Sequence, residues 1–390
     1  MTGAFGRTVL AASLAAAFPS WALWDDKLEV FAQVNATHDS NVFRLSDNVE
    51  AGPRSDTAIT TAAGFALDVP WSLQRFQAGF TWYDARYRRF EDLDHRGHRG
   101  TANWLWSITP RLTGDLGFVQ TRGLASFANI QGRTPDLVTA RSAYANAAWM
   151  VSPSWRLHAL LVGAEVEHTG AREINDLEAA TAEMGVSYVT AQENRLGVAY
   201  RREEGKNPRT FLLFGQPFDN AYEQDSVGMQ GRWVITGLSR LDGRVDYTRR
   251  RYEQLSQRDY SGPTFRLTHT YTPTGKLTFA TSVQRDIAPL EDITSSFVLV
   301  TGVTVRPDWA VTEKINVRGN LSYSRWEYFA DQIFSQDFEH RVKNIGVSVM
   351  YRPTRRIALS TGVSREVRTS TLTNADYKVD TAMVEARIGF

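Results

Sequence analysis

Charged and amide side chains of this chain recur at every second position in several segments, the clearest being 241–250, 314–324 and the last ten residues. A strand places alternate residues on opposite faces, so these polar side chains share one face. We place on it Asp115, Glu183, Arg232, Asp242, Arg244, Asp246, Arg266, Asn316, Arg318, Asn320, Glu385 and Arg387. Rings of such side chains around a watery lumen select ions, whereas pairs on neighbouring strands only brace the wall. Both interpretations stay open for each residue.

The C-terminal segment shows which element must carry these side chains. Ala382, Val384, Ala386 and Ile388 share a face with the terminal Phe390, and the residues between them include Glu385 and Arg387. An apolar face with a polar reverse and a final aromatic residue is typical of the closing strand of an outer-membrane β-barrel. The alternative is the last strand of a soluble sandwich, although so large a sandwich would need a second hydrophobic layer.

Turn signals rich in proline and glycine punctuate the chain about every 35 to 45 residues. They lie at 69–72, 109–111, 152–154, 191–194, 236–238, 272–275, 306–308 and 352–354. Longer polar segments lie between them at 38–53, 91–97, 123–137, 170–177, 204–221, 329–337 and 369–375. Short turns at one end and long loops at the other predict an all-β fold. We expect one transmembrane antiparallel up-and-down β-barrel of about 18 strands (16–18), with both termini in the periplasm.

The N-terminus predicts export. Arg7 precedes an apolar run and a small-residue site that ends at Ala22, which is the pattern of a secretory signal peptide over residues 1–22. Residues 23–390 would then form the barrel. No stretch is apolar over the length that a membrane helix needs, so a membrane protein with this sequence must be a closed barrel. Trp71, Trp155 and Trp309 lie at predicted short turns, where an aromatic girdle would meet the inner interface.

Composition limits the classes of function. The chain is 22% charged with a mean hydropathy of −0.34, which fits a barrel with a polar lumen and not a helical membrane protein. Without cysteine it has neither disulfides nor thiolate chemistry. A net charge of +1 gives no bulk attraction to nucleic acid. The basic residues are mostly arginine, which suits fixed contacts with carboxylates or phosphates.

No catalytic or metal-binding motif is present. His95 and His98 are expected on a loop or its edge without the further ligands that a metal needs. Ser154 and His158 are close in sequence but lie at a turn, so they do not make a hydrolase site. We therefore expect no enzyme activity, no metal and no cofactor.

Several segments resemble a known family, at 35–47, 54–57, 70–76, 87–90, 102–112, 258–262 and 272–277. The run from Asp39 to Leu45 is the most specific. They are similar to the outer-membrane β-barrel protein of exosortase-associated exopolysaccharide operons (EpsL-type), within a wider β-barrel porin 2 class. This resemblance implies passage of extracellular polysaccharide across the outer membrane of a Gram-negative bacterium. The partners expected are outer-membrane lipid and lipopolysaccharide, the polysaccharide, the barrel-assembly machinery and periplasmic polysaccharide export components.

The leading hypothesis is a non-enzymatic conduit with a polar lumen that takes part in polysaccharide export. The alternatives are a structural or accessory barrel, plugged by its own loops, and a general small-solute porin. The segment 204–221 is apolar enough to fold into the lumen as a constriction. The basic tract Arg249 to Arg251 is expected near the outer rim, where it would bind anionic polymer or lipopolysaccharide phosphate, or else be solvated.

Overall fold

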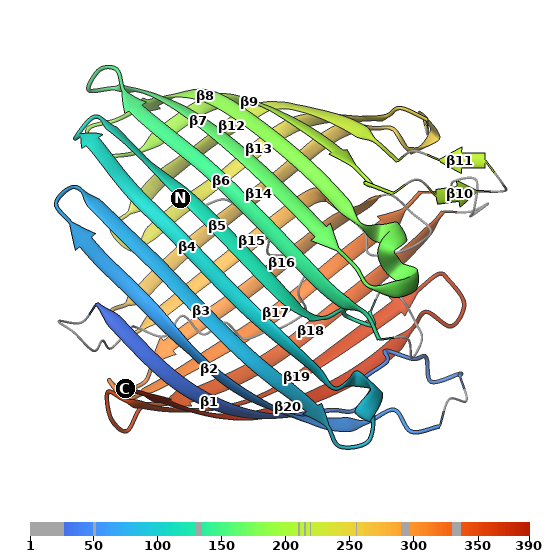
Figure 1. The fold of residues 1–390 in the computed structure, drawn as a ribbon. Coiled ribbons are helices and arrows are strands. Elements are labelled where there is room, and N and C mark those ends of the chain that lie inside the picture. Colours follow the sequence, from blue (N-terminus) through green and yellow to red (C-terminus); the bar gives the residue numbers. More distant parts are fainter. Residues whose placement is uncertain are drawn as a thin grey trace.

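A computed structural model describes residues 27–49, 52–128, 135–209, 211–213, 216–218, 220–254, 256–289, 297–329 and 337–390. Eighteen strands form one closed antiparallel sheet (Figure 1). Each strand pairs with the next along the chain, β9 pairs with β12, and β1 closes the ring on β20. The predicted up-and-down barrel is therefore confirmed. The predicted signal peptide lies outside the described residues.

The first nine barrel strands are β1 (Leu28–Asp39), β2 (Asp56–Trp71), β3 (Gln74–Tyr87), β4 (His95–Thr109), β5 (Leu112–Leu124), β6 (Leu137–Met150), β7 (Trp155–Glu167), β8 (Leu177–Val189) and β9 (Arg195–Lys206). The other nine are β12 (Tyr222–Thr236), β13 (Ser239–Tyr252), β14 (Tyr260–Thr274), β15 (Leu277–Pro289), β16 (Phe297–Ala310), β17 (Ile315–Tyr328), β18 (Phe338–Tyr351), β19 (Ile357–Ser370) and β20 (Tyr377–Gly389).

Short segments complete the secondary structure. Among the residues that the structure describes, the strands β10 (Phe211–Leu213) and β11 (Gln216–Phe218) pair only with each other. Three 3₁₀ turns, η1 (Glu91–Leu93), η2 (Gly170–Asn175) and η3 (Ser256–Arg258), lie in the long loops. No helix in the described part of the chain is long and apolar enough to cross a bilayer.

Side-chain alternation separates two faces of the wall. In β20, Val384 is 62% exposed and Ile388 is 42% exposed, whereas Glu385 between them is only 9% exposed. Phe390, just beyond the strand, is exposed like the apolar face. The same contrast recurs along the other strands, so the barrel has an apolar outer belt and a polar interior. That arrangement is the one that satisfies both lipid and lumen water.

Most of the predicted turns lie where the sequence indicated, but 306–308 is wrong because these residues are inside β16. The turn comes after it, between Ala310 and Ile315. Pro307 has no N–H to donate, and the regular pairing of β16 with β17 skips this position, between Val305↔Leu321 and Asp308↔Arg318. Gly319 of β17 makes room for the ring, since a Cβ there would lie 2.7 Å from Cγ of Pro307.

The loop predicted at 91–97 is too long, because β4 already begins at His95. His95 and His98 are therefore strand residues on opposite faces of β4, and not loop residues. The predicted aromatic girdle is present as exposed side chains at the short-turn ends: Trp71, Trp155 and Trp309 are 71%, 49% and 48% exposed.

Candidate functional site: the lumen wall and the outer mouth

The strand register places all twelve predicted polar residues on the inward face, opposite the exposed apolar belt. It separates them into three groups. The first group lies on β8 and β12–β14 and comprises Glu183, Arg232, Asp242, Arg244, Asp246 and Arg266. The second group lies on β17 and β20 and comprises Asn316, Arg318, Asn320, Glu385 and Arg387. Asp115 lies alone on β5. Each group has a different set of neighbours.

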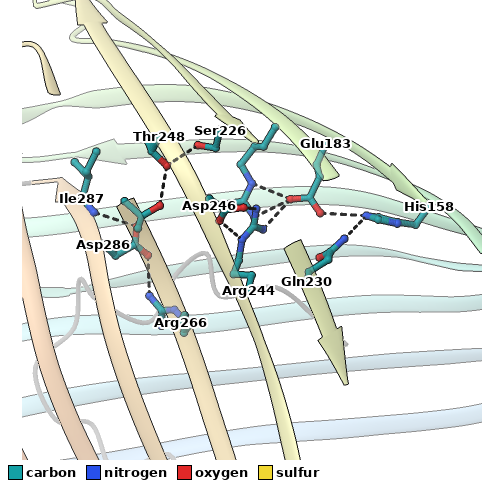
Figure 2. Close-up of polar contacts among 12 residues, drawn as sticks. His158, Glu183, Ser226, Gln230, Arg244, Asp246, Thr248, Arg266, Asp286 and Ile287 are labelled. Atoms are coloured by element: carbon teal, nitrogen blue, oxygen red, sulfur yellow. Dashed lines mark hydrogen bonds and ion pairs between the residues drawn. The ribbon is translucent and has the colours of Figure 1, made fainter. Parts of the chain in front are cut away.

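Glu183 is the centre of the first group. It directly faces Arg201 of β9 across the ladder, and Arg201 Nη2 lies 2.8 Å from its carboxylate. Arg244 Nη1 donates to the same carboxylate at 2.9 Å, and Nε2 of His158 lies 3.3 Å from it (Figure 2). The Glu183 side chain is only 5% exposed, so its charge is held by two arginines instead of by water.

The network continues to both sides of Glu183 (Figure 2). Arg244 also donates to Asp246 at 2.6 Å, and Gln230 lies 2.8 Å from His158. Farther on, hydroxyl contacts join Ser226, Thr248 and Thr264, and Arg266 donates to Asp286 at 3.1 Å. A continuous polar surface therefore covers the inward face from β7 to β15.

Sequence reasoning missed Arg201 and His158. Arg201 is followed by Arg202, so their charge alone does not show which of the two faces inward. The strand register shows that Arg201 does, because it pairs with Glu183. His158 follows Leu157 and precedes Ala159, so the alternation was visible, but its partner Glu183 lies one strand away. Ser154 does not contact His158; its backbone N–H instead donates to Ser152 Oγ.

The basic tract lies at the loop end of β13, but its three arginines differ. Arg249 and Arg251 face outward and are exposed. Arg250 faces inward and is only 3% exposed, so it is not solvated. Its guanidinium lies 4.0 Å from the Tyr222 ring centroid and 3.3 Å from the Glu203 carboxylate. Strand alternation through a run of three like residues explains the split.

The second group is held by local pairs on β16–β20 and β1. Asn316 and Arg318 both donate to Asp308, at 2.6 and 2.8 Å, and Asn320 donates to Asn344 at 2.9 Å. The last two join the barrel's closing seam. Glu385 accepts from Gln33 at 2.7 Å, and Arg387 donates to Glu29 at 2.6 Å across the β20–β1 ladder.

Asp115 belongs to a wall with far fewer charges, formed by β2–β6. Its carboxylate accepts from Asn146 at 2.7 Å. Tyr144 lies flat on this wall over Gly117 and donates to Asn103 at 2.9 Å. A Cβ on Gly117 would come within 2.2 Å of the Tyr144 ring, so glycine is what lets the ring lie flat. The lumen beside this wall is therefore kept wide.

Long loops pack together over the outer mouth. Phe43, from the loop after β1, is fully buried and makes edge contacts with Phe90 and Phe127, whose loops follow β3 and β5. Arg368 of β19 donates to the carbonyl oxygen of Ala128. Six strand spacings separate β5 from β19 along the wall, about 29 Å, but only about 14 Å of chain separates Leu124 from Ala128. The loop therefore takes the shorter path over the mouth.

The loop after β7 joins the same assembly through buried charged groups. Asp136 accepts from the Thr169 backbone at 2.8 Å, and Asp176 accepts from the His168 backbone at 2.7 Å. Arg172 Nη1 lies 3.6 Å from Asp136. Within the described part of the chain, both ring nitrogens of His168 are buried without a hydrogen-bond partner, and Nδ1 lies 3.7 Å from the Asp176 carboxylate. Burial lowers the pKa of His168, so its neutral form is favoured in the packed loop.

The apolar segment 204–221 was expected inside the lumen. Its described part instead includes the β10–β11 hairpin, which projects beyond the barrel at the long-loop end (Figure 1). Phe214 lies outside the described residues. Among the residues that the structure describes, no three His, Asp or Glu side chains are grouped so as to hold a metal ion.

Comparisons with known proteins agree with this architecture. Residues 215–390 match the family model described as "Putative beta-barrel porin 2". No curated protein matches the chain in sequence.

Solved structures with the same fold come from outer-membrane proteins. Pseudomonas aeruginosa OccK2 (OpdF) aligns with a TM-score of 0.53 and 10% identity, over 93% of this chain and 98% of that one. The P. aeruginosa outer membrane protein OpdK gives 0.51 and 10%, over 94% and 100%. A BenF-like porin from Pseudomonas fluorescens Pf-5 gives 0.51 and 9%, also over 94% and 100%. The chain has the fold of these outer-membrane barrels, and its apolar outer belt and polar interior fit the Gram-negative outer membrane.

Proposed function

We propose that the chain forms a diffusion channel for small hydrophilic solutes, which is the general-porin alternative and not the leading hypothesis from sequence. The observation that carries this proposal is the continuous polar surface on β7–β15, rich in charged groups, inside a barrel of eighteen strands. Barrels of this size leave an aqueous channel. Charged groups fixed on one side of such a channel act on passing ions without any chemical step.

Two arginines give the lumen an excess of accessible positive charge. Arg99 of β4 and Arg306 of β16 are inward-facing and exposed, and neither has an ion pair or a hydrogen bond within the described part of the chain. Most other inward arginines are matched by a carboxylate, as Arg244 is by Asp246 and Glu183. We therefore expect a mild preference for anions.

Planar-bilayer recording of the purified protein tests this function. We expect open conductance steps, with the reversal potential in a salt gradient indicating anions. Arg244→Ser and Arg318→Ser remove inward charge and should move the reversal potential toward cations. Arg249→Ser is the matched control because it makes the same change on the outward face. Absence of open steps would reject the channel, and an unchanged reversal potential in both inward variants would reject their place on the lumen wall.

Export of an extracellular polysaccharide is the second candidate. It is supported by the family resemblance, which is closest in the first hundred residues, and by the weakly charged wall on β2–β6, where hydroxyl, amide and tyrosine side chains suit a hydrated polymer. Deletion of the gene should then trap polymer in the periplasm or stop its production, and added polymer should block the channel. Normal secretion with unblocked conductance would leave the small-solute channel, and little conductance would favour an accessory barrel.

A further inference from the structure

The outward-facing residues of the barrel strands carry their charges near the long-loop end. In β18 the outward residues run from Glu339, Arg341 and Lys343 to a purely apolar stretch that begins at Ile345. Neighbouring strands follow the same order, with charges near the long loops and aliphatic or aromatic residues toward the short turns. The charged end therefore faces the outer leaflet and its headgroups.

Cations concentrate on three adjacent strands of this rim. What we call the basic patch consists of Arg325 of β17, Arg341 and Lys343 of β18, and Arg365 of β19. Arg325 and Arg341 face each other directly across the ladder. Arg365 faces Ile345, which makes it a diagonal neighbour of Lys343. The three arginine side chains are about half exposed, at 48%, 55% and 58%.

Carboxylates near the basic patch do not neutralise it. Glu339 accepts from both Arg325 and Arg341, at 2.6 and 2.5 Å, so one acid serves two cations. Glu327 is likewise shared between Arg325 and Arg285. Arg365 has only a 3.5 Å contact with the exposed Asp380. Lys343 has no ion pair or hydrogen bond within the described residues. Four arginines thus share three acids, and Lys343 adds a fifth cation without an acid of its own.

Several other cations on the rim are matched by acids. Arg202 alone contacts Glu204, Glu223 and Asp225. Elsewhere Arg86 lies beside Asp84 and Asp94, and Arg141 beside Glu165 and Glu167. These pairs need no external anion, whereas the basic patch gathers four cations on three adjacent strands with too few acids to match them.

A long apolar surface continues directly below the basic patch. Ile345 and Val363 are both 57% exposed, and Leu321 is 45% exposed, all on the same three strands. A ligand that fits the whole surface must combine acyl chains with an anionic head. Arginine matches phosphate oxygens with two donors at once, and lysine adds a point charge.

We propose that the outward face of β17–β19 binds a phosphorylated, acylated glycolipid of the outer leaflet, with its phosphate on Lys343 and Arg365 and its acyl chains on the apolar surface below. The shared acids keep Arg325 and Arg341 in place, and their free N–H groups face the same headgroup. This site lies on the outside of the wall and is independent of what passes through the lumen.

Native mass spectrometry of the full-length protein in detergent tests the site, with diphosphorylated lipid A as the probe. The double variant Lys343→Gln/Arg365→Gln removes two cations from the basic patch, and Arg86→Gln/Arg141→Gln removes two from the matched part of the rim. With each surface cation contributing to anionic lipid binding, we expect affinity to fall by about 30-fold in the first variant. The second variant should bind within about twofold of the parent. Heat-modifiable gel mobility checks that both variants fold.

Three results would overturn the site. One is equal loss of affinity in the two double variants, which would indicate general rim electrostatics. Another is equal binding of dephosphorylated lipid A, which would mean that acyl contacts alone hold the lipid. The third is displacement of lipid A by millimolar inorganic phosphate, together with an affinity for lipid A that does not depend on its acyl chains. That result would make the ligand a free anion. Stronger binding of diphosphorylated lipid A than of phosphatidylglycerol supports the proposal.

Discussion

Two walls of the same lumen are built differently. On β7–β15 many of the inward side chains are long and charged, and several are held by partners on neighbouring strands, as Glu183 is by Arg201 and Arg244. On β2–β6 the inward side chains are mostly small, and Tyr144 lies flat over Gly117. One wall therefore keeps its shape by ion pairs and the other by close packing of rings on glycine. The two walls meet where β6 pairs with β7, so a charged surface lies beside a weakly charged one.

Neutralising Glu183, the centre of the charged wall, should have the largest effect on the stability of the barrel. Glu183→Gln leaves Arg201 and Arg244 facing a neutral amide in a largely buried position, which should cost about 3 kcal/mol of unfolding free energy. Urea titration of the protein in lipid vesicles, followed by tryptophan fluorescence, measures the loss. Glu165→Gln breaks the exposed outward pair with Arg141 and should cost less than about 1 kcal/mol. If the two variants lose equal stability, the charged network does not brace this wall.

A single added methyl group on the weakly charged wall of β2–β6 should lower both the stability and the conductance of the barrel. Gly117→Ala places a Cβ against the Tyr144 ring and forces it from the wall toward the lumen. We expect a loss of about 2 kcal/mol and a smaller single-channel conductance. Gly163→Ala is the matched control, because nothing lies within 4 Å of a Cβ at that position. Adding Tyr144→Ala to Gly117→Ala should restore conductance; a conductance that stays low would show that the ring is not the obstruction.

The loops over the mouth connect the two walls, and Arg368 is their contact with β19. Its guanidinium is buried, donates to Ala128 and Ala375, and lies 4.4 Å from the Tyr377 ring centroid. Arg368→Ala should destabilise the loop by about 1.5 kcal/mol. Hydrogen exchange of the loop after β5 should quicken, whereas that of the β2–β3 turn should not. Equal exchange in parent and variant would place the loop's main anchor in the Phe43 cluster.

Alternation along each strand was enough to predict the barrel, because a period of two depends only on local sequence. The twelve polar residues share the face opposite the exposed belt, and their role in lining a pore stays a prediction. Alternation was not enough to predict partners. The pairing of Glu183 with Arg201 depends on strand register, and Arg250 looked like part of a solvated tract until its neighbours on β9 and β12 were known. Pro307 was misread as a turn because its tolerance inside β16 depends on Gly319, a residue on the next strand. Contacts between loops, such as Phe43 with Phe127, have no periodicity to reveal them.

The smallest expected effect is a response of the outer mouth to acid. Burial lowers the pKa of His168 in the packed loop below its ordinary value of 6.5, so the opened loop binds a proton more readily than the closed one. The closed form keeps its full stability above pH 6.5 and loses stability as the pH falls below it. Hydrogen exchange of residues 168–176 should therefore quicken by a small factor from pH 7.5 to pH 5, after correction for intrinsic rates. His168→Gln should abolish the change, and His38→Gln on β1 should preserve it. If the parent shows no change, the proton is accommodated between Asp136 and Asp176, and the mouth is insensitive to pH.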